Sequence, residues 1–224
     1  MNMKRQGGYS GSIGVAVATL MLLASGVVVR AADSYWTNWG VGVSGGYWTN
    51  AANWTNTAGA NAYPDNGHAY LLVTNASYTV LYDTAAPAIS NLFVRTAPDK
   101  RTTLVLSAPL SHVGGYILLS NATVYVTNNA VWNYPGTNST ADRLLDIVGG
   151  AELNVCGGSV QFTNLQRATT TQRSSVYVGN SSSTGTLRVT KGQFDFWAPS
   201  GAANNSQVMT VGNGAGSVGR VEIA

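Results

Sequence analysis

Residues 153–162, LNVCGGSVQF, return 34 positions later as LRVTKGQFDF at residues 187–196, and this repeat decides the fold. The alignment places Gly158 on Gly192. On either side of that glycine, apolar residues alternate with more polar ones, which is the period of a β-strand with one buried face. A unit that recurs at this spacing indicates a repeat architecture, in which each unit buries its apolar face against its neighbours.

The repeat extends in both directions along the chain. Upstream, residues 118–133 align with residues 147–162 without a gap at an offset of 29. This alignment places apolar residues on apolar residues: Leu119 with Val148, Val124 with Leu153, Val126 with Val155 and Val131 with Val160. Downstream, the strand VYVGN at 176–180 returns within VMTVGN at 208–213, which begins a fourth copy.

Each copy reads as three short strands separated by glycine corners. The predicted fold is therefore all-β, a parallel β-helix (β-solenoid) with coils of roughly 30 residues. A β-sandwich would need clean two-residue hairpins, and propeller blades are longer than this period. Stacking at about 4.8 Å predicts two outward columns, one with Arg188 beside Glu222 and one with Glu152, Thr186 and Arg220.

The first 31 residues have the three-part layout of a secretory signal peptide. Lys4 and Arg5 precede a largely apolar run from Ile13 to Val29, and a small-x-small site ends at Ala31. We expect cleavage between Ala31 and Ala32, and hence a protein that is secreted or held at the outer surface. The alternative is an uncleaved membrane anchor, because the run approaches the roughly 20 residues that span a bilayer.

Cleavage would change the charge of the chain. Lys4, Arg5 and Arg30 would leave, so the 12 basic residues would become nine against nine acidic ones, and the formal charge would fall from +3 to zero. The mature segment is therefore expected to bind no nucleic acid and to insert into no membrane. The single cysteine, Cys156, allows no intrachain disulfide.

Three segments are expected: the signal peptide at 1–31, an N-terminal cap with the first strands at 32–110, and the repeats at 111–224. Four tryptophans gather in the second segment: Trp36, Trp39, Trp48 and Trp54. We expect an aromatic-rich cap there, since an uncovered strand edge templates aggregation. A second interpretation stays open, in which flat rings and nearby polar groups form a carbohydrate-binding platform. Its candidate ligand-binding residues are Trp48, Asn53, Trp54 and Asp65.

The sequence predicts no catalytic residues, no metal site and no cofactor. His68 and His112 are the two histidines, and neither has a cysteine, histidine or carboxylate at metal-ligand spacing. The outward acids of the repeats fall in different columns or beside Arg and Thr, whereas glycoside hydrolysis needs two carboxyl groups close together. We therefore expect that the chain is not an enzyme.

Several stretches resemble bacterial secreted β-solenoids of the autotransporter passenger type. They are YWTNAANW at 47–54 with the following Pro64 and Asp65, and the VGN, G-T-L-x-V and G-x-F units of the repeats. The family includes autotransporter-associated strand-repeat proteins and similar surface proteins with a C-terminal sorting tail. The resemblance implies secretion or display with an adhesive or matrix role, and it carries over no catalytic residue.

The expected function is thus a secreted or surface-displayed structural or adhesive β-solenoid module. Its expected partner is a polysaccharide or a cell-surface matrix, and the sequence leaves the oligomeric state open. The alternative is a carbohydrate-active β-helix that binds polysaccharide, or a lyase or hydrolase whose site lies outside this segment. Because the fourth copy stops at Ala224, we expect an N-terminal part of a longer protein.

Overall fold

A computed structural model places most of the chain after the predicted signal peptide. The residues that it describes are 32–38, 45–73, 75–113, 115–134, 144–163, 174–196 and 207–224. The signal peptide prediction for residues 1–31 and the position of Trp39 lie outside the described residues. The described chain is nearly all β, and most of its strand pairs are parallel, as the repeats predict.

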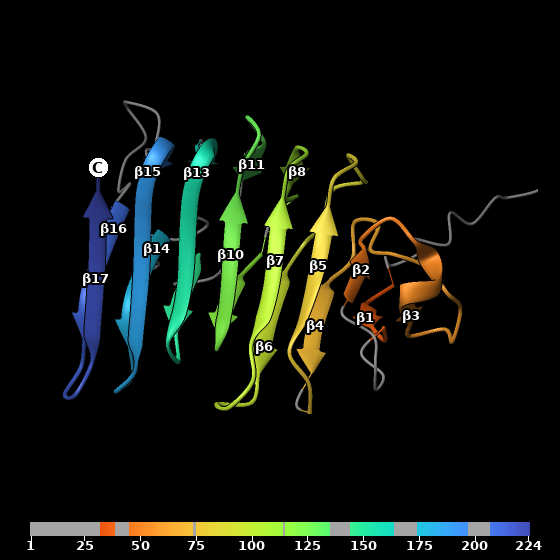
Figure 1. Ribbon diagram of the computed structural model, residues 1–224, viewed down its shortest axis with the longest axis horizontal. Coiled ribbons are helices and arrows are strands. Elements are labelled where there is room, and N and C mark those ends of the chain that lie inside the picture. Colours follow the sequence, from red (N-terminus) through yellow and green to blue (C-terminus); the bar gives the residue numbers. More distant parts are fainter. Residues whose placement is uncertain are drawn as a thin grey trace, which may run out of the picture.

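Two sheets make up the fold, and Figure 1 shows their strands side by side from β1 and β3 at one end to β17 at the other. In spatial order, sheet A contains β16 (Gln207–Asn213), β14 (Ser174–Asn180), β12 (Leu145–Val148), β9 (Ile117–Ser120), β6 (Leu92–Thr96), β4 (Ala69–Val73), β1 (Ser34–Trp36) and β3 (Trp54–Asn56). Sheet B contains β17 (Val218–Ile223), β15 (Thr184–Phe196), β13 (Ala151–Phe162), β10 (Ala122–Val126), β7 (Thr102–Leu106), β5 (Tyr78–Tyr82) and β2 (Gly45–Tyr47). Beside this path, β11 (Val131–Tyr134) pairs with β13 and with β8 (Leu110–Ser111).

The chain alternates between the sheets from β4 onward. Each circuit, meaning the stretch that adds one strand to sheet A and one to sheet B, pairs in parallel with the circuit before it. Inward side chains of equivalent position form rows through the core, and one such row consists of Ala69, Leu92, Ile117, Leu145 and Val176. Because these rows are fully buried, truncating one leucine to alanine is expected to cost about 2–5 kcal/mol.

The predicted offset of 34 between the later copies is confirmed by the strand register. Leu153 pairs with Leu187, and Leu187 pairs in turn with Val221. Earlier circuits are shorter, since Thr102 and its partner Ala122 are only 20 residues apart. The expected length of roughly 30 residues therefore describes the later circuits and not the first ones.

The predicted offset of 29 is correct for one strand and wrong by one residue for two others. The observed partners are Val124 with Leu153 as predicted, Leu119 with Ile147 in place of Val148, and Trp132 in place of Val131 with Val160. Two left-handed glycines, Gly149 and Gly150, lengthen the first connection by one residue relative to Asn121. The second connection is one residue shorter, because β13 runs straight through where a turn joins β10 to β11, so a gapless alignment misses both changes.

The predicted glycine corner between the second and third strands is wrong for β13 and β15. Each runs as one long strand through its glycines, and the register shifts between Val155 and Ser159 mark a bulge. Gly192 reaches φ 153° in β15, where the absence of a side chain lets the bulge form. In the preceding circuit, β10 and β11 are separate strands, as predicted.

The N-terminal end of sheet A is closed by an antiparallel strand. β3 pairs with β1, and a one-turn 3-10 helix, η1 (Ala51–Asn53), leads into it. Trp36 lies at this end with its ring buried and meets Trp54 edge to face at 5.1 Å. Both sheets continue across residues 110 and 111 without interruption, because β7 pairs with β10 and β6 with β9.

Candidate functional site

The tryptophans proposed as a sugar platform lie inside the protein. Trp48 and Trp54 are fully buried and meet edge to face with their centroids 4.7 Å apart. The indole of Trp54 donates a hydrogen bond from Nε1 to the Trp48 carbonyl at 2.6 Å. Packing occupies both rings, so neither offers a face on which a sugar could stack.

The polar members of the same predicted set serve the backbone and a turn. Asn53 is buried, and its Nδ2 donates to the Tyr47 carbonyl at 2.9 Å. Asp65 is exposed and accepts a hydrogen bond from Asn66 Nδ2 at 2.8 Å. The structure therefore does not assemble these four residues into a binding surface.

A different set of aromatic side chains lies on the outer face of sheet A. Tyr35, Tyr70 and Phe93 come from β1, β4 and β6, and their register places them opposite one another. Their rings stack with centroids 4.7 and 4.9 Å apart and interplanar angles of 8° and 4°. We call these three residues the aromatic ladder. Tyr35 at its end is 37% exposed.

Polar residues lie two positions before each ring of the aromatic ladder. The triplets are DSY at 33–35, HAY at 68–70 and NLF at 91–93. In a strand, residues two apart share a face, so a second outward column carries Asp33, His68 and Asn91. Backbone hydrogen bonds hold the residues of this column side by side. The His68 carbonyl accepts from the Ser34 amide, and the Asn91 carbonyl accepts from the Ala69 amide.

A hollow of about 510 Å³ opens beside this polar column, and we call it the Asp33 hollow. Its lining residues are Ala32, Asp33, Thr57, Asn66, Gly67, His68 and Ser90. The lining combines a carboxylate, an imidazole, an amide and hydroxyl groups. These are donors and acceptors for a polar ligand, and the volume lies within the range of small-molecule sites.

The electrostatics of the Asp33 hollow are mild. His68 Nε2 lies 3.9 Å from Asp33 Oδ1, and both side chains are about 30% exposed. His68 Nδ1 is buried and has no hydrogen-bond partner within the described residues. Burial raises the pKa of Tyr70, and the charges of Asp33 and Tyr35 raise it further, so the Tyr70 phenol stays protonated at neutral pH.

A smaller hollow of about 320 Å³ lies farther along the same face of sheet A. Tyr116, Leu118, Ser120, Asp146 and Val148 line it from β9, β12 and the residue before β9, together with residues near the end of β14. The Tyr116 hydroxyl donates to the Asp146 carboxylate. Tyr116 also meets Phe93 edge to face at 6.0 Å, so aromatic contacts join the ladder to this second hollow.

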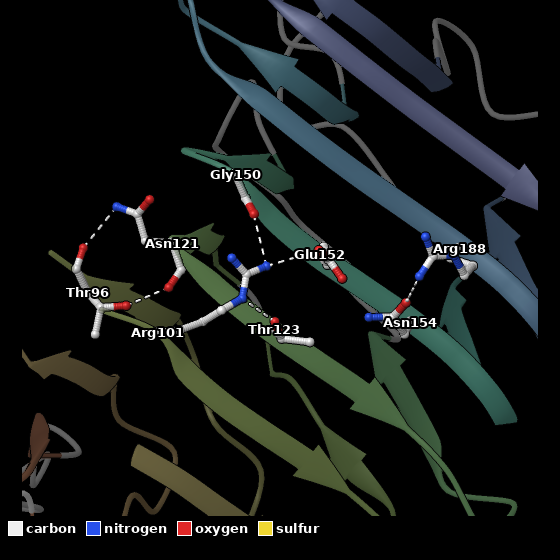
Figure 2. Close-up of polar contacts among 8 residues, drawn as sticks. All are labelled: Thr96, Arg101, Asn121, Thr123, Gly150, Glu152, Asn154 and Arg188. Atoms are coloured by element: carbon white, nitrogen blue, oxygen red, sulfur yellow. Dashed lines mark hydrogen bonds and ion pairs between the residues drawn. The ribbon is translucent and has the colours of Figure 1, made fainter. Parts of the chain in front are cut away.

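The outer face of sheet B is built differently, because its charges pair with one another. Figure 2 shows Arg101 reaching over β10, where its Nη2 donates to the Gly150 carbonyl at 3.0 Å and lies 3.3 Å from Glu152 Oε1. The predicted pair of Arg188 and Glu222 is confirmed at 2.6 Å. The predicted column of Glu152, Thr186 and Arg220 is confirmed by the register.

The Arg188 pair shifts both ionisations toward the charged forms. The carboxylate of Glu222 raises the pKa of Arg188 above its ordinary value, and the guanidinium lowers the pKa of Glu222. Arg188 Nη1 also donates to Asn154 Oδ1 at 3.3 Å, a contact that Figure 2 includes. These contacts link successive strands of sheet B and are partly exposed, so each pair contributes about 0–1 kcal/mol to stability.

The two histidines occupy unlike places. His112 is 1% exposed in the core, whereas His68 lies at the Asp33 hollow. Sequence spacing gave His68 no carboxylate partner; the parallel register of β1 and β4 brings Asp33 to it across 35 positions. Among the residues that the structure describes, no three His, Cys, Asp or Glu side chains gather closely enough to hold a metal ion.

The polar-x-aromatic triplets were the signal that could have located this face. They head three successive strands of sheet A, yet the offsets between them differ, so a fixed-period search passes over them.

Within the described ranges, no helix has the length and apolar character needed to span a membrane. No protein-family model, curated protein or solved structure matches the chain.

Proposed function

We propose that this chain is a non-catalytic β-solenoid module of an exported bacterial protein, capped at its N-terminal end, with an adhesive role at the cell surface. Alternation of the chain between two parallel sheets around one core supports the solenoid. The layout of residues 1–31 supports export, and the repeat units support the likeness to autotransporter passengers.

The adhesive surface in this proposal is the outer face of sheet A. The observation that carries it is the aromatic ladder, with the Asp33 hollow at the starts of its strands and the second hollow farther across the sheet. The outer face of sheet B offers less to a partner, because Arg101, Glu152, Arg188 and Glu222 already pair within the chain. Exposed aromatic side chains are among the features by which a surface gains binding energy.

Binding of the exported full chain to immobilised polysaccharides and to bacterial surface matrix tests this function. Tyr35→Ala removes the exposed end of the aromatic ladder, and we expect it to weaken binding about tenfold. Tyr125→Ala on sheet B is the matched control, since Tyr125 is also 37% exposed. Equal loss in both variants, or no binding by a folded chain, would contradict the proposal.

A further inference from the structure

We propose that the Asp33 hollow binds one sugar residue of a neutral polysaccharide, whose chain continues along the outer face of sheet A beside the aromatic ladder. The inference rests on the proposed adhesive function and names its ligand. It replaces the buried tryptophans as the place where a carbohydrate would bind. Its support comes from the shape, the chemistry and the charge of this face.

The shape fits a ligand that enters from the sheet surface. The Asp33 hollow lies between the start of β4 and the residues around β1 and β6, with His68 and Ser90 both in its lining. His68 meets Tyr70 edge to face, with ring centroids 6.1 Å apart, so the hollow adjoins the middle of the aromatic ladder. A polysaccharide that leaves the hollow would therefore meet the aromatic ladder directly.

The chemistry of the lining suits a ligand that is dense in hydroxyl groups. The Asp33 carboxylate accepts two or more hydrogen bonds, and Asn66 contributes a side-chain amide. The hydroxyl groups of Thr57 and Ser90 can both donate and accept. The His68 side chain lies in the same lining and is 31% exposed, so its imidazole adds a further hydrogen-bonding group. Sugars carry adjacent hydroxyls that satisfy such mixed groups together.

The stacking of the aromatic ladder decides how a ligand would touch it. Tyr70 has Tyr35 on one side and Phe93 on the other, both nearly parallel to it, so its two faces are covered. The ladder thus presents ring edges and the phenol groups of Tyr35 and Tyr70 to a ligand. Polar hydroxyls and C–H groups of a sugar suit these edges, and Tyr35 at the exposed end also offers the ring face that Tyr70 does not cover.

The charge of this face selects a neutral glycan. Asp33 lies in the lining of the hollow, and the exposed Arg95 lies two residues after Phe93 on β6, so the face carries charges of both signs and no excess of positive charge. A uronic acid residue in the hollow would meet repulsion from the Asp33 carboxylate, whereas a neutral sugar would not. Neighbouring strands are about 4.8 Å apart, close to the length of one sugar unit, so an extended chain would pass one strand per sugar.

Calorimetric titration of the exported full chain tests the site with four hexasaccharide probes: cellohexaose, xylohexaose, maltohexaose and hexagalacturonate. We expect binding of at least one neutral probe and much weaker binding of the uronate. Asp33→Asn and His68→Gln keep the size of each side chain, and each is expected to weaken the neutral probe about tenfold. Tyr125→Ala serves as the control and is expected to change affinity by less than about twofold.

Circular dichroism and thermal melting of every variant separate a lost site from a lost fold. Unchanged affinity in folded Asp33→Asn and His68→Gln, or a preference for the uronate, would overturn the sugar site. Matrix binding that depends on Tyr35 but not on these two residues would overturn this inference and leave the adhesive function standing. Failure of the folded chain to bind any matrix would overturn the adhesive function itself.

Discussion

His112 places an ionisable group in the core, where its ring centroid lies 6.0 Å from that of Trp132 and 5.8 Å from that of Tyr134. Burial lowers the pKa of His112 from its ordinary 6.5 to about 4, while a hydrogen bond to the Ser90 carbonyl opposes the shift. Above pH 6.5 the imidazole is neutral in both the folded and the unfolded chain. Below pH 6.5 the unfolded chain takes up the proton first, so stability falls until about pH 4.

The loss expected from His112 over this range is on the order of 3 kcal/mol. Urea unfolding midpoints between pH 7 and pH 4 measure it. His112→Leu removes the titrating group, so its midpoint should vary much less over the same range. A wild-type stability that stays constant between pH 6.5 and 4 would show that the folded chain protonates His112 without cost.

Gly185 lies at a corner where backbone atoms of sheet A approach the backbone of β15 closely. A methyl group at this position would lie 2.0 Å from the Ile147 carbonyl oxygen and 2.7 Å from the Gly179 nitrogen, both backbone atoms. One circuit earlier the same row holds Ala151, where a methyl group fits. Gly185→Ala should therefore destabilise the fold by about 3 kcal/mol, as measured by thermal or urea unfolding.

Gly59→Ala is the matched control for this corner. Gly59 has φ 78° but open space around the position of the missing methyl group. Its substitution should cost only the backbone strain, about 1 kcal/mol. A Gly185→Ala variant no less stable than Gly59→Ala would mean that the sheets move apart at little cost.

At the scale of the strand, the edge element β17 is expected to open most easily. Its inward residues Val221 and Ile223 are 38% and 81% exposed, whereas Leu153 and Val155 of β13 are fully buried. Opening free energies follow buried contacts, so hydrogen exchange should slow stepwise from β17 through β15 to β13. Amide exchange followed by mass spectrometry measures this gradient, and uniform protection across the three strands would contradict it.

Strand identity was predictable from sequence because period-two alternation fixes which face each residue presents. Thus the pairing of Leu153 with Leu187 and the contact of Arg188 with Glu222 follow from one alignment. Register elsewhere depends on turns, and the extra left-handed residue at Gly149–Gly150 moved a strand by one position. The alternation alone contains no information on that insertion.

The candidate site was less predictable for the same reason. Tryptophans suggest a platform by composition, but composition does not say that Trp48 and Trp54 face inward. The proximity of Asp33 to His68 depends on the register of β1 against β4. These strands are neighbours in space, but β2, η1 and β3 lie between them in the sequence. Only the polar-x-aromatic triplets mark the outward face, and they become readable once the strands are aligned.

For the whole molecule, the direction of the backbone hydrogen bonds has a mechanical consequence. They join one circuit to the next along the length of the stack, so under tension between the two ends the circuits would separate one at a time. A single-molecule pulling experiment should then record a series of small ruptures in place of one large one. Each later circuit of 34 residues would release about 110 Å of chain. A stack built this way would lengthen gradually under load and would not fail in a single step.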